Sequence, residues 1–412
     1  MNHVKLTALL FILFAFVMTT TVFAYNGEGV SHSIKQSSDR LDPSTATEGL
    51  VFGLGEDKIW QVKPRFQFRT VFDSNVNREA SGEDEDVIFN INPGIALERK
   101  GSKLRVKADY DLNYQVYVDD SDQNAFNHVF GTEVEYTGDK LNVLLSNDLG
   151  FVKTYASSES SERTSFDYDN LDLEVKYDIT DKVSLAPIYR MNWLEYNESI
   201  LKANSYFIHE FGGRAYYDIT DKTDVYIEGS GHFVDYYESG IYDSQGYKIV
   251  VGAIGKVTDK TTLSVETGFK GREYDDDSIN EYNNWVFQGI IKYYVSSKVN
   301  LELSGKRDIA ESVFGDTGFY SFTRGNLGVN YNATEKINAN AYVGVQGNDY
   351  SKAVGTESKR DDYVVDTGLR FSWTPYRYTS LSTGYAFSTR QSNINTYEYI
   401  DHMVDASVTV TL

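Results

Sequence analysis

The feature that most constrains the fold of this chain is a short polar turn that recurs at a nearly constant interval. The sequence Tyr-Asp-Ile-Thr-Asp-Lys-Val-Ser-Leu at residues 177–185 returns almost unchanged at 217–225. The lysines that close the five clearest copies, at positions 182, 222, 260, 298 and 336, are separated by 40 residues and then three times by 38. A tight polar turn between two segments of alternating polarity joins antiparallel strands, and a constant period indicates one repeated unit. The repeat therefore predicts a series of β-hairpins.

Apolar and polar residues alternate on both sides of these turns, which is the pattern of a half-buried strand. The pattern predicts nine strand pairs, or eighteen strands, at 60–72 with 87–98, 104–118 with 127–136, 141–151 with 167–178, 183–196 with 206–218, 223–236 with 246–257, 261–274 with 281–294, 299–310 with 321–331, 336–350 with 361–373 and 378–390 with 399–412. Such strands are longer than the ~5–6 residues usual in soluble sheets and suit a tilted span of a bilayer.

Composition narrows the class of protein further. The 412 residues include 32 Tyr and only five Pro. No stretch after residue 24 approaches the ~20 apolar residues of a membrane-spanning helix, which excludes an all-helical membrane protein. Long strands with a polar average hydropathy fit a soluble β-array or a transmembrane β-barrel, in which one face of each strand meets lipid and the other meets water.

The N-terminus predicts export. Lys5 precedes an apolar segment at 6–18, and Val22-Phe-Ala24 forms a small-x-small cleavage site, so residues 1–24 are expected to be a cleaved signal peptide. Residues 25–58 are rich in Ser, Gly and charge and are expected to form a flexible periplasmic extension. The chain has no cysteine, so neither a lipid anchor on cysteine nor a disulfide is available.

The connections distinguish a barrel from a soluble sandwich. One set of turns is uniformly short and the other is longer, which is the layout of an outer-membrane barrel with both termini on the short-turn, periplasmic side. Closure also removes the sheet edges that hydrocarbon does not tolerate. We therefore expect an all-β fold: residues 59–412 form an antiparallel up-and-down transmembrane β-barrel of about 18 strands in the outer membrane of a Gram-negative bacterium.

The C-terminal segment, Val-Thr-Val-Thr-Leu at 408–412, resembles the terminal recognition strand of bacterial outer-membrane barrels, although Leu412 replaces the usual Phe. Together with the repeated hairpins, residues 60–412 resemble the "putative β-barrel porin 2" group, whose members often accompany exopolysaccharide export systems. The resemblance implies a channel for exopolysaccharide export. Its implied partners are outer-membrane lipid and lipopolysaccharide, the barrel assembly machinery and a periplasmic export component; no nucleic acid is expected.

Charge predicts what the barrel interior contains. The net charge is −21, and runs of acid at 83–86, 119–122 and 275–277 fall in predicted outer loops. Polar strand faces are instead mixed and slightly basic, so they predict a pore lining that biases which solutes enter. The candidate lining residues are Lys63, Arg65, Arg69, Arg105, Lys107, Lys176, Arg190, Arg214, Lys248, Lys270, Lys292, Lys306, Arg324, Arg370, Glu133, Glu174, Glu228, Glu266 and Glu302. Cross-strand ion pairs that brace a polar interior are the alternative interpretation.

Aromatic residues at strand ends predict the interfacial belts of a membrane barrel. Those beside the short turns are Tyr177, Tyr217, Tyr294, Tyr331 and Trp373, and those near the longer loops are Tyr196, Tyr236 and Tyr274. The strand propensity of Tyr explains them equally. The loops at 153–165 and 351–360 are long enough to fold inward as constrictions, and the sequence does not choose between them.

Residue patterns for catalysis are missing. The six histidines, His3, His32, His128, His209, His232 and His402, have no metal-ligand spacing, and no catalytic constellation is recognisable, so we expect neither an enzyme nor a cofactor. Three functions stay open: polysaccharide export, diffusion of small solutes, or a plugged barrel with a structural or surface-binding role.

Overall fold

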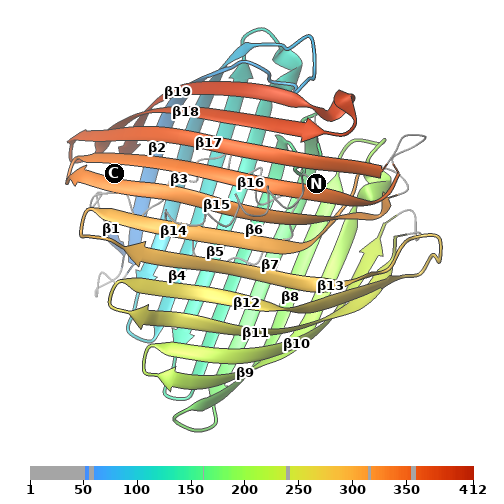
Figure 1. Cartoon of the computed structure of the whole chain (residues 1–412). Coiled ribbons are helices and arrows are strands. Elements are labelled where there is room, and N and C mark those ends of the chain that lie inside the picture. Colours follow the sequence, from blue (N-terminus) through green and yellow to red (C-terminus); the bar gives the residue numbers. More distant parts are fainter. Residues whose placement is uncertain (1–51, 55–59, 161, 238–241, 314–316, 354–358) are drawn as a thin grey trace.

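The computed structural model describes residues 52–54, 60–160, 162–237, 242–313, 317–353 and 359–412. The expected signal peptide and nearly all of the expected N-terminal extension lie outside these residues. The described chain is a single antiparallel sheet that closes on itself as a barrel (Figure 1). The prediction of an up-and-down β-barrel is confirmed.

Eighteen long strands, β2 to β19, make up the wall, and each pairs with its neighbours in the sequence. Their bounds are β2 (Trp60–Asp73), β3 (Asp86–Lys100), β4 (Leu104–Tyr117), β5 (Ala125–Thr137), β6 (Leu141–Thr154), β7 (Thr164–Asp178), β8 (Val183–Tyr196), β9 (Tyr206–Thr220), β10 (Thr223–Tyr236), β11 (Ser244–Thr258), β12 (Thr261–Tyr274), β13 (Tyr282–Tyr294), β14 (Val299–Glu311), β15 (Phe319–Thr334), β16 (Ile337–Ala353), β17 (Lys359–Tyr376), β18 (Thr379–Ser392) and β19 (Tyr399–Thr411). Within the described residues, short 3-10 helices lie in the longer loops at η2 (Ser121–Gln123), η3 (Lys202–Asn204) and η5 (Asn395–Tyr397).

Closure takes place between the last strand and the first long one. β19 pairs antiparallel with β2 from Met403↔Asp73 to Thr411↔Arg65. Beyond the end of β19, the same edge of β2 is paired with a short strand, β1 (Phe52–Leu54), which was not predicted from the sequence. β1 pairs with the first residues of β2. β1 thereby provides hydrogen-bond partners for backbone groups at the start of β2, which β19 does not reach.

The repeated turns have a common chemical basis. In five of them a Ser or Thr hydroxyl accepts a hydrogen bond from the backbone N–H of the lysine two residues later, at 3.2 Å each time. The pairs are Thr180 with Lys182, Thr220 with Lys222, Thr258 with Lys260, Ser296 with Lys298 and Thr334 with Lys336. This local bond tightens the turn, which explains why the Thr-x-Lys or Ser-x-Lys pattern recurs.

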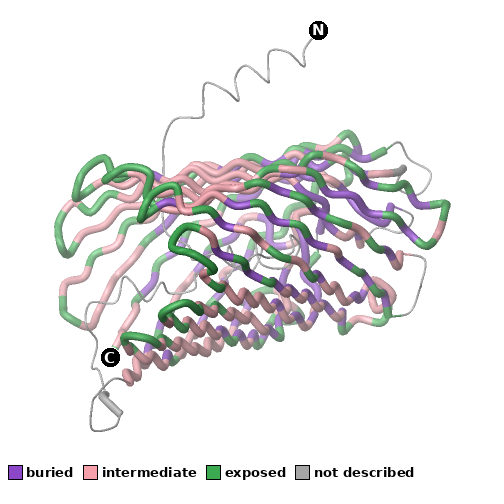
Figure 2. Tube along the Cα trace, turned by 90° about the horizontal axis from the view of Figure 1, so that it is seen from below, coloured by how far each residue is buried: buried purple, intermediate pink, exposed green. Residues whose placement is uncertain are grey.

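Buried and exposed residues alternate along many of the strands (Figure 2). In β2 the outward Phe66, Phe68 and Phe72 are exposed, whereas the inward Gln67 and Asp73 are buried. Buried aromatic side chains fill the interior near the longer loops, among them Phe166, Tyr168, Tyr320, Phe322 and Tyr350. Charged side chains occupy the interior between these aromatic side chains and the short turns.

Only part of the expected aromatic belt exists. Tyr177, Tyr217, Tyr331 and Trp373 are exposed on the outer surface beside the short turns, in rows with other outward residues. Tyr294 is exposed too, but it pairs with the inward-facing Asn300, so its neighbour Tyr293 takes the outer position.

The prediction was wrong for Tyr196, Tyr236 and Tyr274, which are buried inside the barrel. The physical reason is parity: each lies an even number of residues from an inward charged side chain of its own strand, so it faces inward. The exposed aromatic residues toward the longer loops are instead Phe72, Phe126, Phe151, Phe233, Tyr237, Tyr247, Trp285 and Tyr363.

Candidate functional site: the barrel interior and the loop that crosses it

All nineteen residues expected to line a pore lie on the inward-facing register of their strands. The structure brings most of the basic members into contact with carboxylates. The shorter of these contacts are Lys63–Glu98 at 2.7 Å, Arg69–Asp405 at 2.9 Å, Arg105–Glu135 at 2.7 Å, Lys176–Asp224 at 3.0 Å, Lys270–Asp308 at 2.8 Å and Arg370–Asp405 at 3.1 Å. Arg65 with Asp111, Lys107 with Asp109, Lys292 with Glu302 and Arg324 with Asp366 also form ion pairs. The interior is therefore braced by ion pairs, as the alternative interpretation expected.

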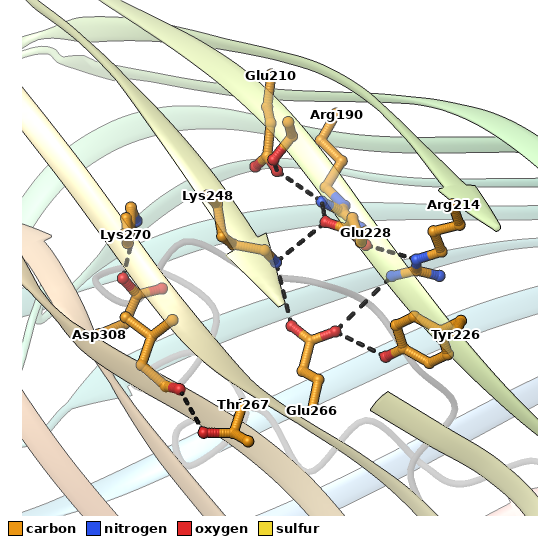
Figure 3. A network of polar contacts seen from close by, with 12 residues as sticks. Arg190, Glu210, Arg214, Tyr226, Glu228, Lys248, Glu266, Thr267, Lys270 and Asp308 are labelled. Carbon is orange, nitrogen blue, oxygen red and sulfur yellow. Dashed lines mark hydrogen bonds and ion pairs between the residues drawn. The ribbon is translucent and has the colours of Figure 1, made fainter. Parts of the chain in front are cut away.

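The densest part of this arrangement lies on β8 to β12 (Figure 3). Glu228, whose side chain is fully buried, contacts Arg190 at 2.9 Å, Lys248 at 3.2 Å and Arg214. Arg190 also contacts Glu210 at 2.7 Å, and Lys248 also contacts Glu266 at 3.1 Å. A fully buried carboxylate is stable only when several cations and donors surround it, which is the case here. This cluster holds five adjacent strands in register from the inside.

Two further members of the predicted lining are Lys306 and Glu133. Lys306 lies 5.8 Å from the centre of the Phe322 ring, on the neighbouring strand. Glu133 faces the interior on β5 and is half-buried, and it pairs in register with Lys107 and Ser146.

The wall formed by β2 to β4 carries a group of amides beside its ion pairs. Asn113 donates to Asn92 at 2.5 Å, Gln115 donates to Asn90 at 3.0 Å, and Asn92 donates to Gln67 at 2.8 Å. Amide groups both donate and accept, so this wall can hydrogen-bond to hydroxyl groups and to water. Charge patterns in the sequence did not identify these residues; the alternation of Asn and Gln with apolar residues was the available signal.

One loop enters the barrel and crosses it. Residues 155–163 connect β6 to β7, and their tip reaches β16, the strand opposite β7 in a ring of eighteen. There the Ser158 hydroxyl accepts from Gln346 at 2.9 Å and from Asn348 at 3.1 Å. Of the two loops expected to constrict the barrel, this one does; the other, 351–360, lies partly outside the described residues.

Two buried arginines hold the tip of this crossing loop. Arg390 of β18 donates to the carbonyl oxygens of Ser158 and Glu159 at 3.0 and 3.1 Å, and Arg360 of β17 donates to the Glu159 carbonyl at 3.2 Å. Both arginines are at most 1% exposed. Because a buried guanidinium needs partners for its donors, the loop and the arginines stabilise each other.

The Glu159 side chain anchors the loop to a third part of the wall. Its carboxylate accepts from the Val313 backbone N–H at 2.6 Å and from the Ser312 hydroxyl at 3.0 Å, both after β14. At the base of the loop Arg163 donates to the carbonyls of Gln123 and Lys153 at 3.0 and 2.8 Å. The loop is thus fixed at its base and at its tip.

A cavity of about 60 Å³ lies between this loop and the charged wall. Ala156 and Ser157 of the loop close one side, and charged residues of β8, β9, β12 and β14 form the other. Its charged lining residues are Arg190, Glu210, Lys270, Arg272, Lys306, Asp308 and Glu311.

The acidic runs expected at the outer rim are not all solvated. Asp86 is buried, and its carboxylate accepts backbone hydrogen bonds from Val118, Asp119 and Asp120 at 2.9 to 3.2 Å, so it ties two loops together. In the described parts of the chain, no group of three His, Asp or Glu side chains is placed to hold a metal ion. No helix among the described residues has the length and apolar character needed to cross a bilayer.

Comparison with known proteins assigns the family. The pattern of the family described as "Putative beta-barrel porin 2" matches residues 202–412, just over half of the chain. No curated protein shows significant sequence similarity to this chain.

Several solved structures of similar shape have low sequence identity to this chain. OpdK from Pseudomonas aeruginosa is 8% identical, with a TM-score of 0.48 over 85% of this chain and 99% of that chain. OccK2 (OpdF) from P. aeruginosa, solved with glucuronate, is 8% identical, with a TM-score of 0.47 over 89% and 100%. OccAB3 from Acinetobacter baumannii is 8% identical, with a TM-score of 0.46 over 86% and 99%. Similarities of this size carry no information about the solute. The family match and the closed barrel together place this chain in the putative beta-barrel porin 2 family, as an outer-membrane β-barrel porin.

Proposed function

We propose that this barrel is a diffusion channel for small polar solutes, with residues 155–163 as its constriction. The observation that carries the proposal is the crossing loop, which is fixed to opposite parts of the wall by Arg163 at its base and by Arg360 and Arg390 at its tip. A barrel of eighteen strands is wide enough to enclose an aqueous channel, and an inward loop restricts the size of what passes.

The interior supports polar rather than apolar cargo. The ion-pair cluster around Glu228 lies on β8 to β12, and β2 to β4 carry amide groups beside further ion pairs. A solute that passes between them exchanges hydrogen bonds with water for hydrogen bonds with these groups. Because most of the charges are already paired, we expect weak rather than strong ion selectivity.

Export of an exopolysaccharide, the function implied by the family resemblance, is the second candidate. A polymer would have to pass through the position that Ser158 and Glu159 occupy, and the loop would have to leave it. Export would also require a periplasmic component, whereas diffusion requires none. These two requirements rank export below diffusion.

Conductance in a planar bilayer, with a salt gradient to read selectivity, tests the proposal. The purified protein is compared with a variant in which residues 156–162 are replaced by a short Gly-Ser turn. We expect a small, stable conductance that rises several-fold in the variant. The variant Lys103→Ala is the matched control, because Lys103 pairs with Asp139 in the exposed short turns and is not among the lining residues.

Two results would contradict diffusion through a loop-restricted pore. An unchanged conductance in the loop variant would show that the loop does not limit passage. If neither protein conducts under any salt or voltage condition, the remaining functions are polysaccharide export and a plugged barrel with a structural role.

A further inference from the structure

Three tyrosine–histidine pairs on the outer surface have almost the same geometry. In each pair the tyrosine hydroxyl lies 2.9 Å from histidine Nδ1, and the ring centres lie 6.0 to 6.2 Å apart with the ring planes 23 to 30° from parallel. The pairs are Tyr110–His128 between β4 and β5, Tyr189–His209 between β8 and β9, and Tyr385–His402 between β18 and β19. Three of the six histidines in the chain are therefore paired with a tyrosine in the same geometry.

The three pairs also lie at the same height on the barrel. Each tyrosine is the eighth residue of its strand and each histidine is the fourth residue of the next strand, both counted from the longer loops. A tilted strand gains about 2.5 Å of height per residue, so each histidine lies about 8 Å below the loop end of its strand. Exposed apolar residues, such as Phe126 above His128 and Ile400 above His402, continue beyond them. The pairs are therefore inside the outer edge of the apolar belt.

Their face is the one that meets lipid. The residues opposite the three tyrosines, Phe130, Phe211 and Val404, are at least 40% exposed. The interactions of these histidine rings within the described residues are all with tyrosine or phenylalanine side chains, and none uses Nε2 as a hydrogen-bonding atom.

The chemistry of the pair decides which ring nitrogen of the histidine carries the hydrogen. A phenol is a much stronger acid than a neutral imidazole N–H, so the tyrosine donates and histidine Nδ1 accepts. In the neutral ring the remaining hydrogen is then on Nε2. An N–H that faces hydrocarbon without an acceptor is unfavourable. Because the same arrangement occurs three times, we infer that a group in the membrane accepts the hydrogen bond from each Nε2–H.

We propose that each of the three pairs is a binding site for lipopolysaccharide, in which histidine Nε2–H donates to an acyl carbonyl oxygen of the lipid. Ester and amide carbonyls lie at the boundary between hydrocarbon and head group, which is the depth of these histidines, whereas phosphates lie further out. The longer loops mark the outer side of the membrane, where lipopolysaccharide is the acylated lipid. This inference does not depend on whether the barrel conducts.

Lipid binding to purified protein tests the proposal. Native mass spectrometry in a sugar-headgroup detergent measures the affinity for lipopolysaccharide of the wild type and of the H128F/H209F/H402F variant, with phosphatidylethanolamine as the second lipid. We expect the affinity of each site for lipopolysaccharide to fall about fivefold, the value of one net hydrogen bond. The matched control replaces the exposed outward aromatics Phe68, Phe89 and Phe269, which belong to none of the three pairs, by leucine, which removes rings but no donor.

Equal affinities of the wild type and the histidine variant would overturn the proposal. An equal loss for phosphatidylethanolamine would overturn lipopolysaccharide as the occupant. If the triple variant fails to fold, nitrogen-15 spectra of the single variant Y110F decide: in lipopolysaccharide bilayers the wild type should show three Nε2–H signals protected from exchange, and Y110F should lose one. Three rapidly exchanging signals in the wild type would refute the sites.

Discussion

Protonation of Glu159 should control whether the crossing loop stays inside the barrel. Its carboxyl group is completely buried, and burial raises its pKa to about 7, although the backbone N–H of Val313, the Arg360 guanidinium and the Ser312 hydroxyl act in the opposite direction. The other charged or titratable groups that face it are Asp362 of β17, Arg390 of β18, Tyr350 of β16 and Tyr196 of β8. A loop that leaves the barrel exposes the carboxyl to water, where its pKa is the ordinary ~4.3.

The sign follows from proton linkage. The inserted loop binds the proton more tightly than the released loop, so falling pH favours insertion, and rising pH through about 7 removes that advantage. Between pH 8 and pH 5 the difference in proton affinity stabilises the inserted loop by roughly 2.5 kcal/mol, or about 70-fold in population. We therefore expect a more open channel at pH 8 than at pH 5.

Thiol labelling measures this equilibrium without assuming conductance. The chain contains no cysteine, and Ala156 is 2% exposed on the crossing loop, so an A156C variant is a single reporter. Its reaction with a membrane-impermeant maleimide is compared with that of A156C/E159Q at pH 5 and pH 8, which cancels the intrinsic pH dependence of the thiol. Labelling of A156C should increase with pH by up to about 70-fold more than that of the glutamine variant.

Glutamine keeps the shape of the side chain and an acceptor oxygen but does not titrate in this range, so the loop of E159Q should stay inserted at both pH values. Equal pH dependence of the two proteins, or faster labelling of A156C at pH 5, would refute the argument. Single-channel recordings at the same pH values would then show whether the conductance follows the loop.

Three further perturbations have defined outcomes. Arg390→Ala removes charged hydrogen bonds to three loop carbonyls, so we expect the loop reporter to label about tenfold faster or more, whereas Arg105→Ala should leave the rate unchanged. Gly150→Ala places a methyl group against the buried Tyr168 ring and should lower the free energy of unfolding, measured by thermal melting, by about 1–3 kcal/mol. The control in the same experiment is Gly325→Ala, whose added methyl group meets no atom within 4 Å. Trp373 is 45% exposed on the outer surface, so brominated lipids should quench its fluorescence, and a W373F variant should lose that part of the quenching.

Local sequence carried most of the information about the strands and the turns. The Thr-x-Lys turn depends on a hydrogen bond between a hydroxyl and an N–H two residues apart, so it can be recognised from the local sequence wherever it occurs. The alternation of polar and apolar residues fixes which side chains share a face, and for this reason the nineteen candidate lining residues could be assigned to one surface. The error at Tyr196, Tyr236 and Tyr274 arose because closeness to a strand end was used without parity.

Tertiary structure decided everything that depends on which distant strands face each other. Glu228 meets Arg190 from two strands away, and Ser158 meets Asn348 from across the barrel. The sequence showed that loop 153–165 was long enough to enter the barrel, but its partners Arg360 and Arg390 lie about two hundred residues further along the chain. Such contacts depend on the number of strands, their stagger and the closure of the last strand on the first, which are properties of the whole sheet. The sequence by itself therefore determined the hairpins and their two faces, and only closure of the barrel determined what meets inside it, because strand alternation is a local property and juxtaposition across a barrel is not.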